Sequence, residues 1–111
     1  MLNRNFKFES VAGTIEITQE PSYQEIKEGS KVELVFKCKA RGIKRLTYQW
    51  YKDDTVLQGK NEGTLVLKTV LPDFGWYKCV ASCKDNSSIR VESSPAELDV
   101  IPRDGKSKYV A

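Results

Sequence analysis

The stretches CKARGIKRLTYQW (residues 38–50) and DFGWYKC (residues 73–79) decide the fold of this chain. Cys38 and Cys79 are 41 positions apart, and Trp50 follows Cys38 by 12 positions. Around each of the three, apolar residues alternate with polar ones, which is the period of a β-strand with one buried face. The two cysteines and the tryptophan are therefore expected at inward-facing positions on three different strands.

The rest of the sequence predicts further short strands separated by turns. Runs rich in Val, Ile, Thr, Tyr and Phe recur about every 8 to 12 residues, and no segment has a convincing helical period. Such a pattern of about seven or eight strands fits an all-β sandwich or a small barrel. The expected strands cover residues 14–19, 23–26, 31–40, 47–52, 56–57, 63–70, 75–83 and 89–100.

Length and composition are those of one globular domain. The chain has 111 residues, of which 40% are hydrophobic and 30% charged, so it can form one packed core but not two. Its apolar runs are far shorter than the roughly 20 residues that span a bilayer. The 18 basic and 15 acidic residues are mixed along the chain, whereas nucleic-acid-binding proteins concentrate basic residues. Neither membrane insertion nor nucleic-acid binding is predicted.

A larger pattern surrounds the two cysteines and the tryptophan. Its members are Cys38, Trp50, Leu65, Leu67, Val70, Asp73, Gly75, Tyr77, Cys79 and Ala81. Together they resemble the I-set branch of the immunoglobulin superfamily, which implies an immunoglobulin-like two-sheet Greek-key sandwich over residues 14–101, with Tyr77 forming a tyrosine corner. Only 15 positions separate Trp50 from Leu65, too few for the extra strands of a variable domain, which favours the I-set or C2-like form.

Three shorter segments, CKARG (38–42), YQWYK (48–52) and AELDV (96–100), are similar to the immunoglobulin domains of paracaspases. In that family such domains flank a cysteine-protease domain and serve as docking modules in intracellular signalling. The resemblance implies a non-catalytic protein-protein interaction module of a larger cytoplasmic signalling scaffold, with linkers at residues 1–13 and 102–111. Two alternatives stay open: an extracellular cell-adhesion or receptor domain, and a structural spacer of a filament or muscle protein.

The cellular compartment decides the state of the cysteines. Cys38 and Cys79 form either a core disulfide, worth about 2 to 4 kcal/mol, or a reduced thiol pair packed on Trp50. Residues 1–10 lack the apolar core of a signal peptide, which slightly favours reduced thiols. Cys83 is expected to be a small apolar residue at the edge of the core.

Other candidate sites have ordinary explanations. Asn86 begins an Asn-Ser-Ser triplet, which is a glycosylation site only in a secreted protein. The adjacent carboxylates Asp53 and Asp54 are expected in a solvated turn. The chain has no histidine, and three cysteines alone do not complete a typical structural zinc site. We therefore predict no catalytic residue, no metal and no cofactor.

The expected partner-binding surface is the outer face of residues 47–52, 75–83 and 89–100, which are the C, F and G strands of the family. Because Tyr77 and Cys79 point inward, their neighbours along the strand are expected to point outward. Exposed aromatic residues among polar ones are typical of protein interfaces, so the partners would be other proteins or neighbouring domains of the same chain. The residues predicted on this surface are Gln49, Tyr51, Trp76, Lys78 and Val80.

Overall fold

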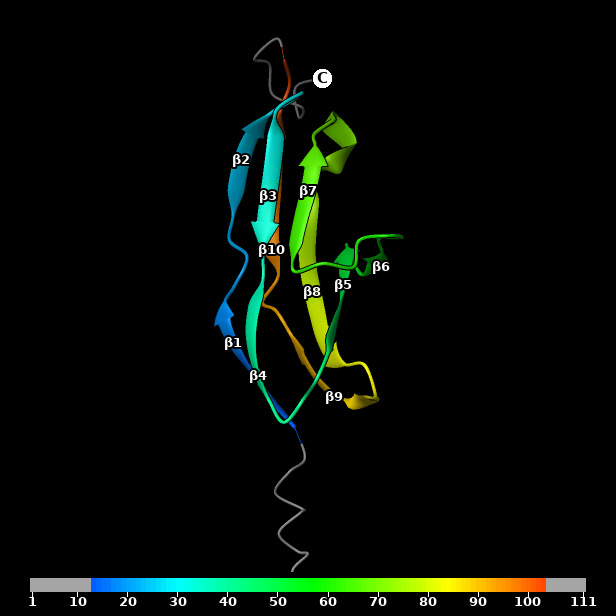
Figure 1. Cartoon of the computed structure of the whole chain (residues 1–111). Coiled ribbons are helices and arrows are strands. Elements are labelled where there is room, and N and C mark those ends of the chain that lie inside the picture. The colour runs from blue at the N-terminus through cyan, green and yellow to red at the C-terminus, as the bar shows by residue number, and fades with distance from the viewer. Residues whose placement is uncertain (1–12, 104–111) are drawn as a thin grey trace, which may run out of the picture.

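Two layers of β-strands make up the part of the chain that the computed structural model describes, residues 13–103 (Figure 1). The bounds of the strands are β1 Thr14–Gln19, β2 Gln24–Lys27, β3 Lys31–Val35, β4 Lys37–Arg41, β5 Leu46–Lys52, β6 Thr55–Val56, β7 Thr64–Lys68, β8 Gly75–Cys83, β9 Asn86–Glu92 and β10 Ala96–Ile101. A single 3-10 turn, Leu71–Asp73, joins β7 to β8. The prediction of an all-β, immunoglobulin-like sandwich is confirmed.

One layer is a sheet of strand order β2-β10-β8-β5-β6, with β9 also paired to β8. The β10 strand runs parallel to β2 and antiparallel to β8, and the β5, β6, β8 and β9 pairings are antiparallel. The second layer holds the antiparallel pairs β1-β4 and β3-β7. Because β3 and β4 are separated only by Phe36, these two pairs continue one another (Figure 1).

Two of the eight expected strands are each interrupted once, which gives ten. Phe36 separates β3 from β4, and its N–H donates to the carbonyl of Gly63 at 2.8 Å. Residues 93–95 separate β9 from β10, where Pro95 has no N–H to donate to a ladder. Ser93 closes this gap, since its Oγ accepts from the N–H of Cys79 at 2.9 Å and its own N–H donates to the carbonyl of Cys79 at 2.8 Å.

The core lies between the two layers and is built around Trp50, which is fully buried. Its Nε1 donates to the carbonyl of Glu62 at 2.7 Å, so the indole is buried with its polar group satisfied. Phe36 and Tyr48 meet edge to face, with ring centroids 6.5 Å apart. The buried members of the core are Val32, Leu34, Phe36, Trp50, Leu65, Tyr77, Cys79, Ala81, Leu98 and Val100.

The start of β8 is tied to the preceding turn by Tyr77. Its buried hydroxyl donates to the carbonyl of Asp73 at 2.5 Å, and burial is the main cause of its raised pKa. The carboxylate of Asp73 in turn accepts from the N–H of Val70 at 2.8 Å. The hydrogen bond from Tyr77 back to residue 73 is the tyrosine corner that the sequence predicted.

The predicted linkers at 1–13 and 102–111 lie outside the described residues, apart from Gly13, Pro102 and Arg103. Within residues 13–103, no helix has the length and hydrophobicity that crossing a bilayer requires.

Candidate protein-binding surface

The outer face of the β5-β8-β10 sheet carries the residues predicted to bind a partner. The β5 and β8 strands pair in a register that places Tyr51 opposite Lys78 and Gln49 opposite Val80. At the other end of β8, Trp76 lies opposite Glu97 of β10. The structure therefore brings the five predicted residues onto one face, although they differ widely in exposure.

Trp76 is the most exposed of the five, with 52% of its surface accessible. Its backbone is fixed by Asp53, whose Oδ1 accepts from the N–H of Trp76 at 3.0 Å and whose own N–H donates to the carbonyl of Trp76 at 2.8 Å. Asp53 and Asp54 have φ values of 48° and 66°, as a tight two-residue hairpin turn between β5 and β6 requires. The backbone of Trp76 is thus held firmly while its ring stays accessible.

Gly75 allows this close approach of the Asp53 carboxylate. Its φ is 151°, and a Cβ at this position would lie 2.8 Å from Oδ2 of Asp53. A larger residue would therefore displace the carboxylate that holds Trp76.

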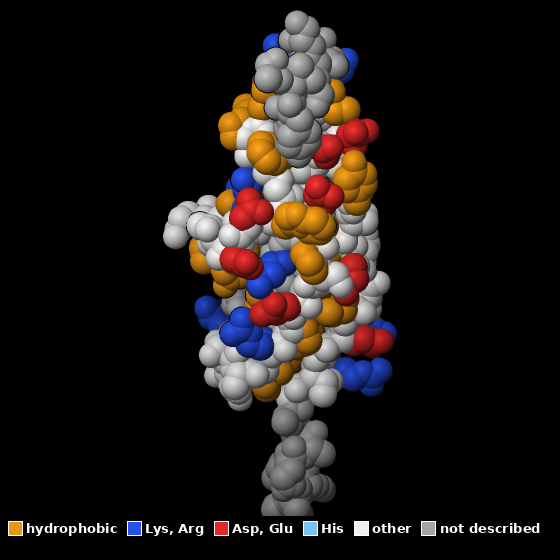
Figure 2. Space-filling view, turned by 180° about the vertical axis from the view of Figure 1, so that it is seen from behind, with side chains coloured by type: hydrophobic (Ala, Val, Ile, Leu, Met, Phe, Trp, Pro, Cys, Tyr) orange, Lys and Arg blue, Asp and Glu red, His pale blue; other side chains and the backbone are white. Residues whose placement is uncertain are grey.

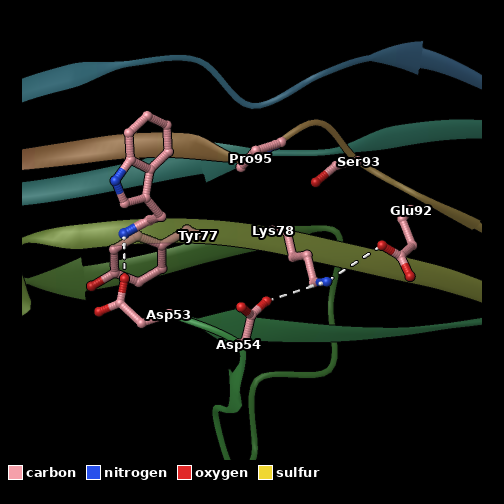
Figure 3. Close-up of a pocket in the computed structure, with 8 residues that line it drawn as sticks. Asp53, Asp54, Tyr77, Lys78, Glu92, Ser93 and Pro95 are labelled. Atoms are coloured by element: carbon pink, nitrogen blue, oxygen red, sulfur yellow. Dashed lines mark hydrogen bonds and ion pairs between the residues drawn. The ribbon is translucent and has the colours of Figure 1, made fainter.

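Lys78 is held in place by three neighbours. Its Nζ lies 3.5 Å from Oδ1 of Asp54, 3.4 Å from Oε1 of Glu92 and 5.7 Å from the centre of the Tyr51 ring (Figure 3). The hydrogen bond to Glu92 is the main cause of the raised pKa of Lys78. The Lys78 amine is therefore protonated, and its charge is already paired with side chains of the same face.

A groove of about 460 Å³ lies over this part of the sheet. Figure 3 shows that the Lys78 amine lies between the carboxylates of Asp54 and Glu92, with Pro95 and Ser93 on the opposite side of the β8 ribbon. In Figure 2, hydrophobic side chains lie at the centre of this face, with acidic and basic side chains around them. We call this feature the Trp76 groove, and its lining residues are Asp53, Asp54, Trp76, Tyr77, Lys78, Glu92, Ser93 and Pro95.

The expectation that Val80 is exposed is wrong. Its side chain is on the predicted face, but only 7% of its surface is accessible. Val80 lies in the middle of β8 with a paired strand on each side, opposite Gln49 of β5 and Glu92 of β9, so it is flanked by neighbours in both directions. Alternation along one strand predicts the direction of a side chain, whereas its burial depends on the neighbouring strands.

Gln49 is occupied within the domain. Its Nε2 donates to the carbonyls of Leu57 at 2.8 Å and Trp50 at 2.9 Å, and its Oε1 accepts from Asn61 at 3.3 Å. Gln49 therefore anchors the segment after β6 to β5. Its amide would have to give up these hydrogen bonds in order to contact a partner.

The cysteines lie in and beside the core as free thiols. Burial raises the pKa of the Cys79 thiol to about 12, and the neighbouring Cys38 thiol contributes to that shift. Cys38 is partly buried, and desolvation is also the main cause of its raised pKa. Cys83 is buried near the end of β8, as expected for a small apolar residue.

Asn86 begins β9 and is exposed. Its Oδ1 accepts hydrogen bonds from the N–H of Ser88 at 3.1 Å and the hydroxyl of Ser88 at 2.6 Å. The Asn-Ser-Ser triplet was expected in a turn, but the structure places it at the exposed start of β9, where a sugar chain would meet no part of the domain's core.

Sequence reasoning missed two glutamates on this face, Glu92 in the lining of the Trp76 groove and Glu97 beside Trp76. Glu92 and Glu97 both lie on the outer face, yet they are an odd number of positions apart, so one uninterrupted strand could not place both there. The interruption at residues 93–95 shifts the alternation between β9 and β10. Pro95 is the signal that could have revealed this break.

Among residues 13–103, no three Asp, Glu, Cys or His side chains are grouped so that they could hold a metal ion.

Comparisons with known proteins agree with this geometry. No curated protein matches the sequence. The structure resembles the tandem Ig repeats of Dlar, with 31% identity and a TM-score of 0.67 over 83% of this chain, which spans half the length of the Dlar structure. It also shares its fold with a chimeric titin Z1Z2 (23% identity, TM-score 0.66, 81% of this chain and 97% of that one) and with Duf (Kirre) D1 (22%, 0.66, 79% and 97%). The model of the immunoglobulin domain family matches residues 16–82, more than half of the sequence, so the chain belongs to the immunoglobulin domain family.

Proposed function

We propose that this domain is a non-catalytic protein-binding module that contacts its partner through the outer face of β5, β8 and β9-β10, centred on the Trp76 groove. Immunoglobulin domains are typically protein-protein interaction modules and are generally non-catalytic. One solved relative in fold, the titin Z1Z2 pair, is in complex with telethonin. The observation that carries the proposal for this chain is the exposed indole of Trp76 beside a groove.

Trp76 has the properties of an interface anchor. Tryptophan is among the residues that contribute most to binding energy in protein interfaces, since it covers a large area with few rotatable bonds. Here Asp53 fixes the N–H and the carbonyl of Trp76, so the backbone loses little further conformational freedom on binding. The rim of charged side chains around it resembles the polar rim of an interface.

We place this module in a larger intracellular signalling scaffold of paracaspase type. The support is the similarity of residues 38–42, 48–52 and 96–100 to the immunoglobulin domains of that family. The finer assignment to the I-set form rests on the short interval between Trp50 and Leu65. In an extracellular adhesion or receptor protein, Cys38 and Cys79 would instead be joined by a disulfide and Asn86 could carry a glycan. A mass measurement of the thiols in protein from its native source separates these two parents.

The binding proposal is tested by comparing matched surface variants in affinity capture from an extract of the native source. Trp76→Ser removes the anchor, and Val66→Ser removes a 41%-exposed side chain from β7 in the other layer. Proteins that bind the wild type and the Val66 variant, but not the Trp76 variant, support the proposal. If all three domains capture the same proteins in equal amounts, the face is not the binding surface, and the domain acts as a spacer or binds elsewhere.

A further inference from the structure

The Trp76 groove also indicates the chemical class of its partner. We propose that it receives a lysine or arginine side chain from the partner protein, with the cation lying over the Trp76 indole and paired to Glu97. This inference rests on the proposed function, because it specifies what the same face binds.

Glu97 is the first observation behind this assignment. The pairs Ala96–Tyr77 and Glu97–Trp76 are successive in the β10-β8 ladder, and the first pair is buried, so the second points to the outer face. Directly opposed side chains in an antiparallel ladder have their Cβ atoms about 5 Å apart. Glu97 is half-buried, and no basic group within residues 13–103 forms an ion pair with it. A carboxylate thus stands beside an exposed indole without a cation.

Each carboxylate that lines the groove already has a basic partner. Lys78 pairs with Asp54 and Glu92, while Lys52 lies 3.6 Å from Asp53 and Arg90 lies 3.9 Å from Glu92. Glu97 lies beside Trp76 and, among residues 13–103, is not within ion-pair distance of any lysine or arginine. An anionic partner would have to displace one of these existing pairs. A cationic partner only has to approach Glu97.

The indole favours the same class of partner. The face of a tryptophan ring attracts lysine and arginine cations, most strongly where water is excluded. Trp76 is accessible enough to be covered by a partner, and Pro95 offers an apolar surface nearby for the aliphatic part of a long side chain. The volume of the groove lies in the range of roughly 300 to 1,000 Å³ that is usual for ligand pockets.

The test uses two synthetic peptides of equal length and opposite charge, acetyl-Gly-Arg-Leu-Arg-Gly-amide and acetyl-Gly-Glu-Leu-Glu-Gly-amide. Each is titrated into the ¹⁵N-labelled 111-residue chain while backbone and indole resonances are followed by NMR. We expect the arginine peptide to shift the signals of Trp76 and Glu97 in a saturable way. The glutamate peptide should bind there at least about threefold more weakly, since one ion pair at a surface changes affinity by a few-fold.

Matched variants separate the specific contact from general electrostatic attraction. Glu97→Gln keeps the shape of the side chain and should weaken the arginine peptide about two- to fivefold. Glu16→Gln, an exposed carboxylate on β1 in the other layer, should leave the affinity unchanged. Raising the salt concentration should weaken binding to the wild type more than to the Glu97 variant.

Two results would overturn the assignment. If the glutamate peptide shifts the Trp76 signals at least as strongly as the arginine peptide, the face binds peptides but selects the opposite charge, and the proposed function stands without this inference. If the arginine peptide shifts only signals away from Trp76, or binds the Glu97 variant as tightly as the wild type, the pairing with Glu97 is wrong.

Discussion

Replacing Trp50 by alanine tests the packing of the core most severely. The side chain is fully buried, and an indole that buries about 150 to 250 Å² of apolar surface contributes up to about 4 to 6 kcal/mol at about 25 cal/mol per Å². The unfolded chain is partly compact, and the core relaxes around the cavity, so the expected loss for Trp50→Ala is about 3 to 5 kcal/mol. That loss is large compared with the total stability of a typical domain, about 5 to 15 kcal/mol.

Urea denaturation followed by far-UV circular dichroism measures this loss, with Trp50→Phe as a graded variant. Phenylalanine keeps most of the apolar volume but cannot donate to the carbonyl of Glu62, so a smaller loss of about 1.5 to 3 kcal/mol is expected. Trp76→Phe is the matched control and should change stability by less than about 0.5 kcal/mol, because the ring is half-exposed. A loss below about 1 kcal/mol for Trp50→Ala, or one equal to that of the Trp76 control, would refute the placement of Trp50 in the core.

The remaining predictions concern hydrogen bonds, ionisation and backbone geometry. Ser93→Ala should cost about 1 to 3 kcal/mol in urea denaturation, since it leaves the buried N–H of Cys79 without its acceptor; a loss below about 0.5 kcal/mol would contradict this. Burial raises the pKa of Tyr77, so its contribution to stability is present below about pH 10 and lost as the pH rises further; ultraviolet titration should show a tyrosine step above pH 10 that the Tyr77→Phe variant lacks. Both thiols of the Cys38 and Cys79 pair have raised pKa values, and disulfide-exchange reagents at pH 8 should label the partly exposed Cys38 before Cys79; the reverse order would count against the described burial. Gly75→Ala should lower the melting temperature, because the new Cβ would meet the Asp53 carboxylate; an unchanged melting temperature would mean that the turn adjusts freely.

Most of the fold was predictable because its information is local. The alternation around Cys38 and Cys79 gives strand direction, and the position of Tyr77 two residues before Cys79 gives the tyrosine corner. These patterns place Trp50, Tyr77 and Cys79 in the core, where the structure has them. Cys38 was expected to be buried in the core. It faces the core but is only partly buried, because β4 lies toward one end of the sandwich (Figure 1).

The candidate surface was predictable only in part, because exposure depends on strands that are distant in sequence. Val80 and Trp76 point to the same face of β8, yet the pairing with β5 and β9 covers one and the turn at Asp53 leaves the other open. The position of Glu97 beside Trp76 depends on the register of β10 after the break at residues 93–95, which no alternation pattern conveys. The ion pairs of Lys78 could not be predicted either, because they join residues that only the pairing of the strands brings together.

Photo-crosslinking tests most directly the claim that the Trp76 face binds a partner protein. A benzoylphenylalanine residue replaces Tyr51, which lies beside Lys78 on the same face and leaves Trp76 in place, or Val66 on the opposite layer, in the protein as expressed in its native cells. We predict a discrete crosslinked adduct from position 51 and none from position 66, although Val66 is 41% exposed. An adduct from position 66 alone, or adducts of equal yield from both positions, would contradict the account.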